Sequence, residues 1–239
     1  MNSDTEAPRQ KIIEIFPELW KKVYERHVKS QIVSGCHDPF HTARVGQYAL
    51  TIAENETVAR LAGIAGLCHN ADRILQYDLG LGREDTPEEL VITLVNEWFD
   101  VTDLSEKERS LVLDAVLKHS LPNNPDDSQV LITLKDADRL INLEPDTIMR
   151  TAHFFSDFPV VDPVHWLSDP EATYREPRSV IKGLASCAEW GNFDDPKYGV
   201  RLPKARICAK KFADYLLDYI ERVKECWEEA GLLPFIPPK

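Results

Sequence analysis

Apolar side chains recur at helical spacing through most of this chain, and that pattern constrains the fold more than any other feature. A helix with such a pattern buries one stripe and leaves its other side in water. No segment shows the alternation of polar and apolar residues that indicates a half-buried strand, and no repeat unit recurs. We therefore predict an all-α fold: a single helical bundle of roughly nine helices.

Turns rich in Pro, Gly, Asn and Asp separate the expected helices. The helices are predicted over about 11–30, 40–53, 57–76, 86–98, 105–119, 127–142, 145–155, 178–190 and 203–230. Two starts, at Thr86 and at Ser105, have the spacing of a capping box. We expect residues 1–9 to be a disordered terminus, residues 10–230 one domain, residues 157–176 a long loop and residues 231–239 a tail.

Composition disfavours several classes of protein. The 239 residues carry a formal charge of −12, which repels phosphate backbones and makes nucleic acid an unexpected partner. No apolar run reaches the ~20 residues of a membrane span, so no membrane association is predicted. The polar, acidic start lacks the features of a signal peptide, and the five cysteines include no Cys-x-x-Cys pair. We expect reduced thiols and a cytoplasmic location, and the sequence leaves an oligomer open.

A polar stretch, residues 66–73, interrupts the apolar, alanine-rich helix predicted at 57–76. His69 and Asn70, followed by Asp72 and Arg73, stand among Ala, Ile, Leu and Cys. Polar groups are costly to bury in such surroundings unless something binds or pairs them. We interpret this stretch as the floor of a metal site.

Further metal-capable side chains lie on other predicted helices. They are His41 in the second helix, His119 at the end of the fifth and Asp138 inside the sixth. Imidazoles and carboxylates from several helices can converge on one ion in the core of a bundle. A mixed nitrogen and oxygen set suits Zn, Mn, Fe, Ni or Co better than a site that selects sulfur, and Mg stays open.

The order of these residues resembles the HD-domain superfamily of metal-dependent phosphohydrolases. That family has a lone His, a His-Asp pair on a later helix and a final Asp. The flanking segments match too, at Cys36–Val45, Leu67–Arg73 and Asp136–Leu140. The resemblance covers about residues 30–155. It implies that His41, His69 and Asp138 hold a divalent metal ion and that Asn70 completes or nearly completes the ligand shell.

The resemblance also implies an activity: hydrolysis of a phosphate ester of a nucleotide or another small phosphorylated metabolite, by water bound to the metal. His119 lies where some members place a His that meets a second metal or the substrate phosphate. Together with Asp72 and Arg73 it completes the expected catalytic set. The phosphate oxygens need cationic partners, and the candidates, left open, are Arg44, Arg73, Lys118 and Arg139.

Asn70 departs from the family pattern, which has Asp at this place. An amide oxygen can ligate a hard cation, but it carries no charge and cannot act as a base. We hypothesise that Asp72, three residues beyond His69 on the same helix face, partly replaces the missing carboxylate, directly or through a water. The alternative is a catalytically weakened or inactive binding or regulatory module. A purely structural protein is a third reading, which the convergent histidines count against.

Each group of candidate residues also has an interpretation without a bound ion or substrate. The metal-capable residues could form a buried polar network without an ion. The pair His37 and Asp38 is more readily explained as a helix cap than as a metal site. Aromatic residues flank the long loop, and core packing is favoured over a wall for a flat substrate. They are Phe154, Phe155, Phe158, Trp166 and Tyr174.

Overall fold

The computed structural model describes residues 11–30, 37–82 and 85–235, and every regular element in these ranges is a helix. The prediction of an all-α fold is confirmed. The elements are α1 (Ile12–Ile15), α2 (Pro17–Lys29), α3 (Pro39–Ile52), α4 (Glu56–Cys68), α5 (Ala71–Leu79), α6 (Glu88–Phe99), α7 (Glu106–Lys118), α8 (Gln129–Ile141), α9 (Thr147–Phe154), α10 (Val180–Ala188), the 3₁₀ helix η1 (Glu189–Gly191) and α11 (Pro203–Glu229).

Within the described ranges there are eleven α-helices, two more than the sequence predicts. Both additions come from breaks in predicted helices. The first predicted helix divides at Phe16, where Pro17 opens a new helix. The third divides at His69 and Asn70, which serve as the C-cap of α4 and the N-cap of α5.

One of the two predicted capping boxes is formed. At the start of α7, Oε2 of Glu108 accepts hydrogen bonds from the backbone N–H of Ser105 at 2.9 Å and from its hydroxyl at 2.7 Å. The box predicted at Thr86 is wrong. Pro87 is extended there, with ψ of 127°, so α6 begins one residue too late for the Thr86 side chain to cap it.

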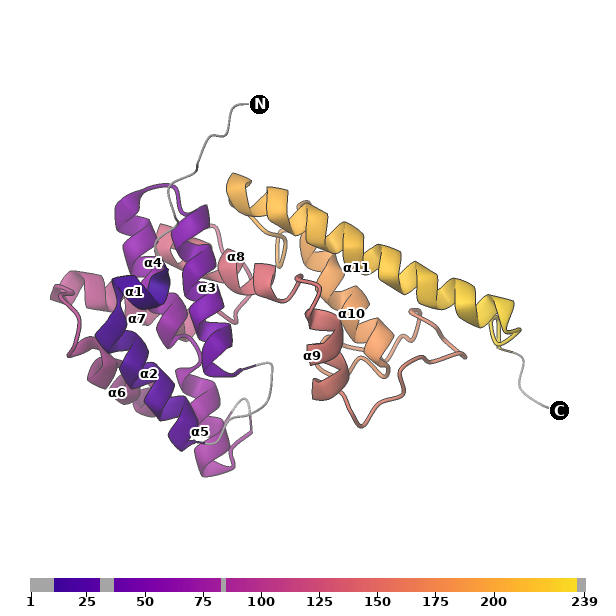
Figure 1. Ribbon diagram of the computed structural model, residues 1–239, viewed down its shortest axis with the longest axis horizontal. Coiled ribbons are helices and arrows are strands. Elements are labelled where there is room, and N and C mark those ends of the chain that lie inside the picture. The colour runs from indigo at the N-terminus through magenta and orange to yellow at the C-terminus, as the bar shows by residue number, and fades with distance from the viewer. Residues whose placement is uncertain (1–10, 31–36, 83–84, 236–239) are drawn as a thin grey trace.

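The helices that carry the site surround α8. In Figure 1, α1–α7 gather on one side of α8, while α9, α10 and the long α11 lie on the other. Helix α8 packs against α3 and α4, and it also contacts α11. The backbones of α3 and α4 approach closely, because a Cβ added to Gly66 would stand 2.6 Å from the Gly46 nitrogen.

One buried cluster runs from Ile12 in α1 to Leu216 in α11. A smaller cluster, formed mainly by residues of α10 and α11 with Val161, lies under the long loop. Helix α11 therefore completes the same core as the bundle around α8. Among the described helices, none combines the length and apolarity needed to cross a membrane.

Candidate metal centre

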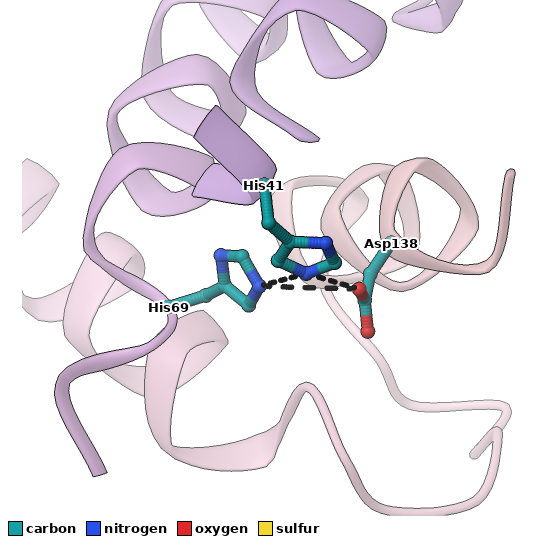
Figure 2. A group of neighbouring side chains, drawn as sticks. All are labelled: His41, His69 and Asp138. Atoms are coloured by element: carbon teal, nitrogen blue, oxygen red, sulfur yellow. Dashed lines mark hydrogen bonds and ion pairs between the residues drawn. The ribbon is translucent and has the colours of Figure 1, made fainter. Parts of the chain in front are cut away.

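His41, His69 and Asp138 converge on one point from α3, the end of α4 and α8 (Figure 2). The two Nε2 atoms are 3.2 Å apart. Oδ1 of Asp138 lies 3.3 Å from Nε2 of His41 and 3.9 Å from Nε2 of His69. One nitrogen or oxygen atom from each residue therefore faces a shared centre, which is the arrangement that a metal ion requires.

Local structure sets the direction of each imidazole. The carboxylate of Asp38 caps α3 by accepting the His41 backbone N–H at 2.7 Å, which fixes the first turn. Nδ1 of His69 lies 2.7 Å from the carbonyl oxygen of Gly66. A carbonyl only accepts, so Nδ1 carries the proton and Nε2 directs its lone pair at the shared centre.

The charge state of the group suits a cation. His69 is 1% exposed, and burial lowers its pKa to about 3, so its imidazole is neutral as a metal ligand must be. Burial opposes ionisation of Asp138, but the hydrogen bond from His41 and the neighbouring imidazoles lower the pKa of its carboxyl. The neutral imidazole of His69, the carboxylate of Asp138 and the second imidazole, of His41, are a donor set that fits a divalent ion.

Asn70, the expected fourth ligand, follows His69 directly and is the N-cap of α5. Its side chain is 2% exposed and lines the same cavity as the three ligand candidates. Among the described residues no atom hydrogen-bonds to its Nδ2. A buried amide without a partner is costly, which favours a bound group at this place.

The structure does not bring Asp72 into the metal-capable group, which counts against direct replacement of the missing carboxylate. Its Oδ2 lies 3.6 Å from Nε of Arg73, and it belongs neither to the metal-capable group nor to the cavity lining. The hypothesis assumed one continuous helix through His69. Because the helix breaks at Asn70, the three-residue spacing no longer puts Asp72 on the face of His69.

Two further histidines flank the centre. His119, the C-cap of α7, lines the cavity with its ring centroid 5.2 Å from that of His69. His37 lines it as well, with a ring centroid 6.1 Å from that of His41. Sequence reasoning missed His37 by assigning the His37–Asp38 pair to helix capping. Only Asp38 has that role.

The cavity in front of the centre has a volume of about 900 Å³ and a cationic lining. Arg73 and Arg139, two of the four expected phosphate partners, belong to it. The other two pair elsewhere: Arg44 with Asp146 at 2.7 Å and Lys118 with Asp114 at 2.5 Å. Lys135 and three residues that follow α8 in the chain, where no motif marks them, complete the cationic set. These three are Arg150, Arg175 and Lys182.

Aromatic side chains line the same cavity. Of the five flanking the long loop, Phe154, Phe155 and Tyr174 belong to the lining, whereas Phe158 and Trp166 do not. Phe154 is 54% and Tyr174 47% exposed, so the preference for core packing is wrong for these two. Trp190 and Tyr198 also line the cavity and were not expected there.

A second metal-capable group, Asp162, His165 and Asp169, lies in the long loop. Oδ1 of Asp162 accepts the backbone N–H of His165 at 3.2 Å, and its Oδ2 lies 3.0 Å from the His165 ring nitrogen. These contacts hold Asp162 and His165 together without an ion.

The chain is similar to proteins of known fold. Residues 40–143 match the family model described as HD domain. An HD-superfamily hydrolase from Bacillus thuringiensis has a TM-score of 0.59 and 20% identity, over 91% of this chain and 98% of that one. A protein from Lactobacillus plantarum has a TM-score of 0.61 and 14% identity, over 90% and 97%. No curated protein matches the sequence. Residues 40–143, which carry His41, His69, Asn70, His119 and Asp138, are therefore an HD domain.

Proposed function

We propose that this protein is a metal-dependent phosphohydrolase that cleaves a phosphate ester of a nucleotide or another small phosphorylated metabolite. One observation carries the proposal: His41, His69 and Asp138 converge in the wall of a large cavity that is otherwise rich in Lys and Arg. The bound ion and the phosphate would thus face the same space. The similarity to a hydrolase of the HD superfamily supports this proposal at the level of the fold.

Each residue has a role in this scheme. His41, His69 and Asp138 would hold a divalent ion, which makes a water nucleophilic near neutral pH and withdraws charge from the phosphate. Arg73 and Arg139 would neutralise phosphate oxygens. Nε2 of His119 would accept a proton, because Nδ1 lies 2.7 Å from the Val116 carbonyl and therefore carries the ring proton.

A second candidate function, a binding or regulatory module without hydrolysis, is motivated by Asn70. An amide in place of a carboxylate removes one negative charge from the ligand set and weakens the hold on a divalent ion. The same fold and the same cavity would then recognise a phosphorylated ligand and release it unchanged.

The test combines metal analysis with an assay. We expect the purified protein to bind Mn or Co and then to hydrolyse p-nitrophenyl phosphate. His69→Gln should reduce hydrolysis by roughly 100-fold or more, because it removes a ligand candidate. His165→Gln, at an exposed histidine of the long loop, is the matched control and should leave the rate unchanged. Metal binding without turnover under any cation would favour the binding module.

A further inference from the structure

Two buried imidazole nitrogens have no hydrogen-bond partner among the residues that the structure describes. They are Nδ1 of His41 and Nε2 of His27. The His41 side chain is 5% exposed and that of His27 1%, so bulk water does not reach either nitrogen. A buried polar atom without a partner is costly. Both atoms would be satisfied if one donated a hydrogen bond to the other.

The packing of two helices makes His27 and His41 neighbours. Helix α2, which carries His27, contacts α3, which carries His41. The ring centroids of Trp20 and Tyr24 lie 6.4 and 6.3 Å from that of Phe40, the residue before His41. His27 lies three residues beyond Tyr24 on the same face of α2. Burial lowers the pKa of His27, and His41 is close enough for its charge to lower this pKa further.

The two nitrogens differ in what they can do. Nδ1 of His27 lies 2.8 Å from the Val23 carbonyl oxygen, which only accepts, so Nδ1 carries the proton of the neutral ring. Nε2 of His27 therefore holds a lone pair and is an acceptor. In His41 it is Nε2 that faces His69 and Asp138, at 3.2 and 3.3 Å (Figure 2). As a ligand, His41 would give the lone pair of Nε2 to the ion, and its proton would be on Nδ1 as a donor.

A ligand imidazole is held in its tautomer and its orientation by the group that accepts its other N–H. For His69 this group is the carbonyl oxygen of Gly66, at 2.7 Å from Nδ1. For His41 the described part of the chain supplies no acceptor within hydrogen-bond distance. The neighbouring side chain with a buried lone pair is that of His27. If the two nitrogens are too far apart for a direct hydrogen bond, one water between them would complete the link.

We propose that His27 is a positioning residue of the metal centre: its Nε2 accepts the Nδ1–H of His41, directly or through one water, and so directs Nε2 of His41 at the ion. The inference rests on the metal centre of the proposed function, which His41 shares with His69 and Asp138. It adds to that centre a side chain of α2, which precedes the matched residues 40–143 in the sequence.

Calorimetric titration of the metal-free full chain with Co²⁺ tests this role without turnover. His27→Leu removes the acceptor and keeps an apolar side chain in its place, and we expect a loss of affinity of about 10–100-fold. His27→Gln has an amide oxygen that can accept in place of Nε2, so it should recover most of the loss. In the Co²⁺-loaded protein the N–H protons of the ligand imidazoles give shifted proton resonances that disappear in D₂O. His27→Leu should move one of them.

Leu19→Ala is the matched control, because Leu19 is 1% exposed on the same helix and has no polar side-chain atom. The cavity that it leaves should lower the midpoint of thermal unfolding of the metal-free chain. It should leave the Co²⁺ affinity and the shifted resonances unchanged. His27→Leu should lose affinity without a larger loss of thermal stability, which distinguishes a positioning role from a contribution to packing.

The outcomes separate this proposal from the proposed function. Unchanged affinity in His27→Leu, or an equal loss in Leu19→Ala, would overturn the role of His27 and leave the metal centre in place. A wild type that binds no Co²⁺ would overturn the metal centre, and the role of His27 with it. A loss confined to His27→Leu, in a protein that hydrolyses no phosphate ester with any cation, would support the role of His27 and contradict the proposed hydrolysis.

Discussion

At the scale of single residues, Asn70 decides how strongly the centre holds an ion. We predict that Asn70→Asp raises the affinity for Mn by roughly tenfold or more, because affinity for hard cations rises with the number of charged ligands. The rate of hydrolysis should rise with the metal affinity. Titration calorimetry with the metal measures the change directly.

Asn55→Asp is the matched control for that substitution. Asn55 caps α4 by accepting the Val58 N–H at 3.0 Å, and an Asp caps equally well. It lies outside the cavity lining, so its added charge should leave the metal affinity unchanged. An equal gain in both variants would show that Asn70 acts through overall charge and not from beside the ion.

His27 gives a second prediction, on pH. It is 1% exposed, its Nδ1 lies 2.8 Å from the Val23 carbonyl, and burial lowers its pKa below 6.5. Below pH 6.5 the unfolded chain gains a proton that folded His27 does not, so the free energy of unfolding falls with falling pH, until the folded pKa is reached. The slope from this group reaches at most about 1.4 kcal/mol per pH unit.

Urea unfolding at pH 7, 6 and 5 checks this slope. His27→Gln should flatten it by about one proton. His165→Gln should not flatten the slope, because the hydrogen bond that His165 donates to Asp162 raises the pKa of His165 and gives its contribution the opposite sign. An unchanged slope in His27→Gln would mean that His27 is protonated in the folded protein.

Residue positions were predictable where a motif marks them. His41, His69 and Asp138 stand in segments whose order and flanks resemble a family, and the structure brings them together. Asp72 was misplaced, because sequence spacing predicts a shared face only if the helix is continuous. His37 was set aside because its neighbour Asp38 explained the pair.

At the scale of elements, the close contact of α3 and α4 sets the distance between His41 and His69. A Cβ on Gly66 would meet the backbone of Gly46 at 2.6 and 2.7 Å, and backbone cannot swing aside as a side chain can. We predict that Gly66→Ala costs about 1–3 kcal/mol of unfolding free energy, as overpacking does, and also weakens metal binding. Thermal unfolding and metal titration measure the two effects.

Gly80→Ala is the control for Gly66→Ala, because it strains the backbone without crowding a neighbouring helix. Gly80 has φ of +64°, and a Cβ there would meet no atom within 4 Å. We expect a loss of about 1 kcal/mol from the left-handed conformation, with unchanged metal affinity. Equal metal affinities of wild type and Gly66→Ala would contradict the coupling of helix packing to the site.

Periodicity was sufficient to predict where helices lie, but not where they break. The apolar pattern continues through His69 and Asn70, so the division into α4 and α5 left no signal in hydrophobicity. The break directs His69 at the end of α4 and Asn70 at the start of α5 toward one cavity. A polar pair in an apolar helix was the sign of a site, and it also marked the end of the helix.

At the scale of the whole molecule, the cavity is assembled from two stretches of chain that no motif connects. The wall carrying Tyr174, Lys182 and Trp190 follows the HD domain in the sequence. Its placement depends on packing of α9, α10 and α11, which a single sequence does not show. Asp136, which is 0% exposed, connects the two stretches. Its Oδ2 accepts hydrogen bonds from the backbone N–H groups of Arg201 at 2.9 Å and Leu202 at 2.7 Å.

Because of these contacts, we expect that the HD domain does not fold without the segment that follows it. This expectation agrees with the prediction of one domain over 10–230. A chain ending at residue 157 would lose the apolar residues that α11 and its approach add to the main core, among them Leu202, Ala209 and Leu216. It would also remove the two backbone groups that donate to the carboxylate of Asp136. We predict that this truncated chain shows no cooperative thermal unfolding, whereas a chain ending at residue 233, which keeps these contacts, unfolds like the full chain. Cooperative unfolding of the shorter chain, with unchanged metal affinity, would contradict the prediction of a single domain. The segment with Tyr174, Lys182 and Trp190 would then not be needed for the HD domain to fold.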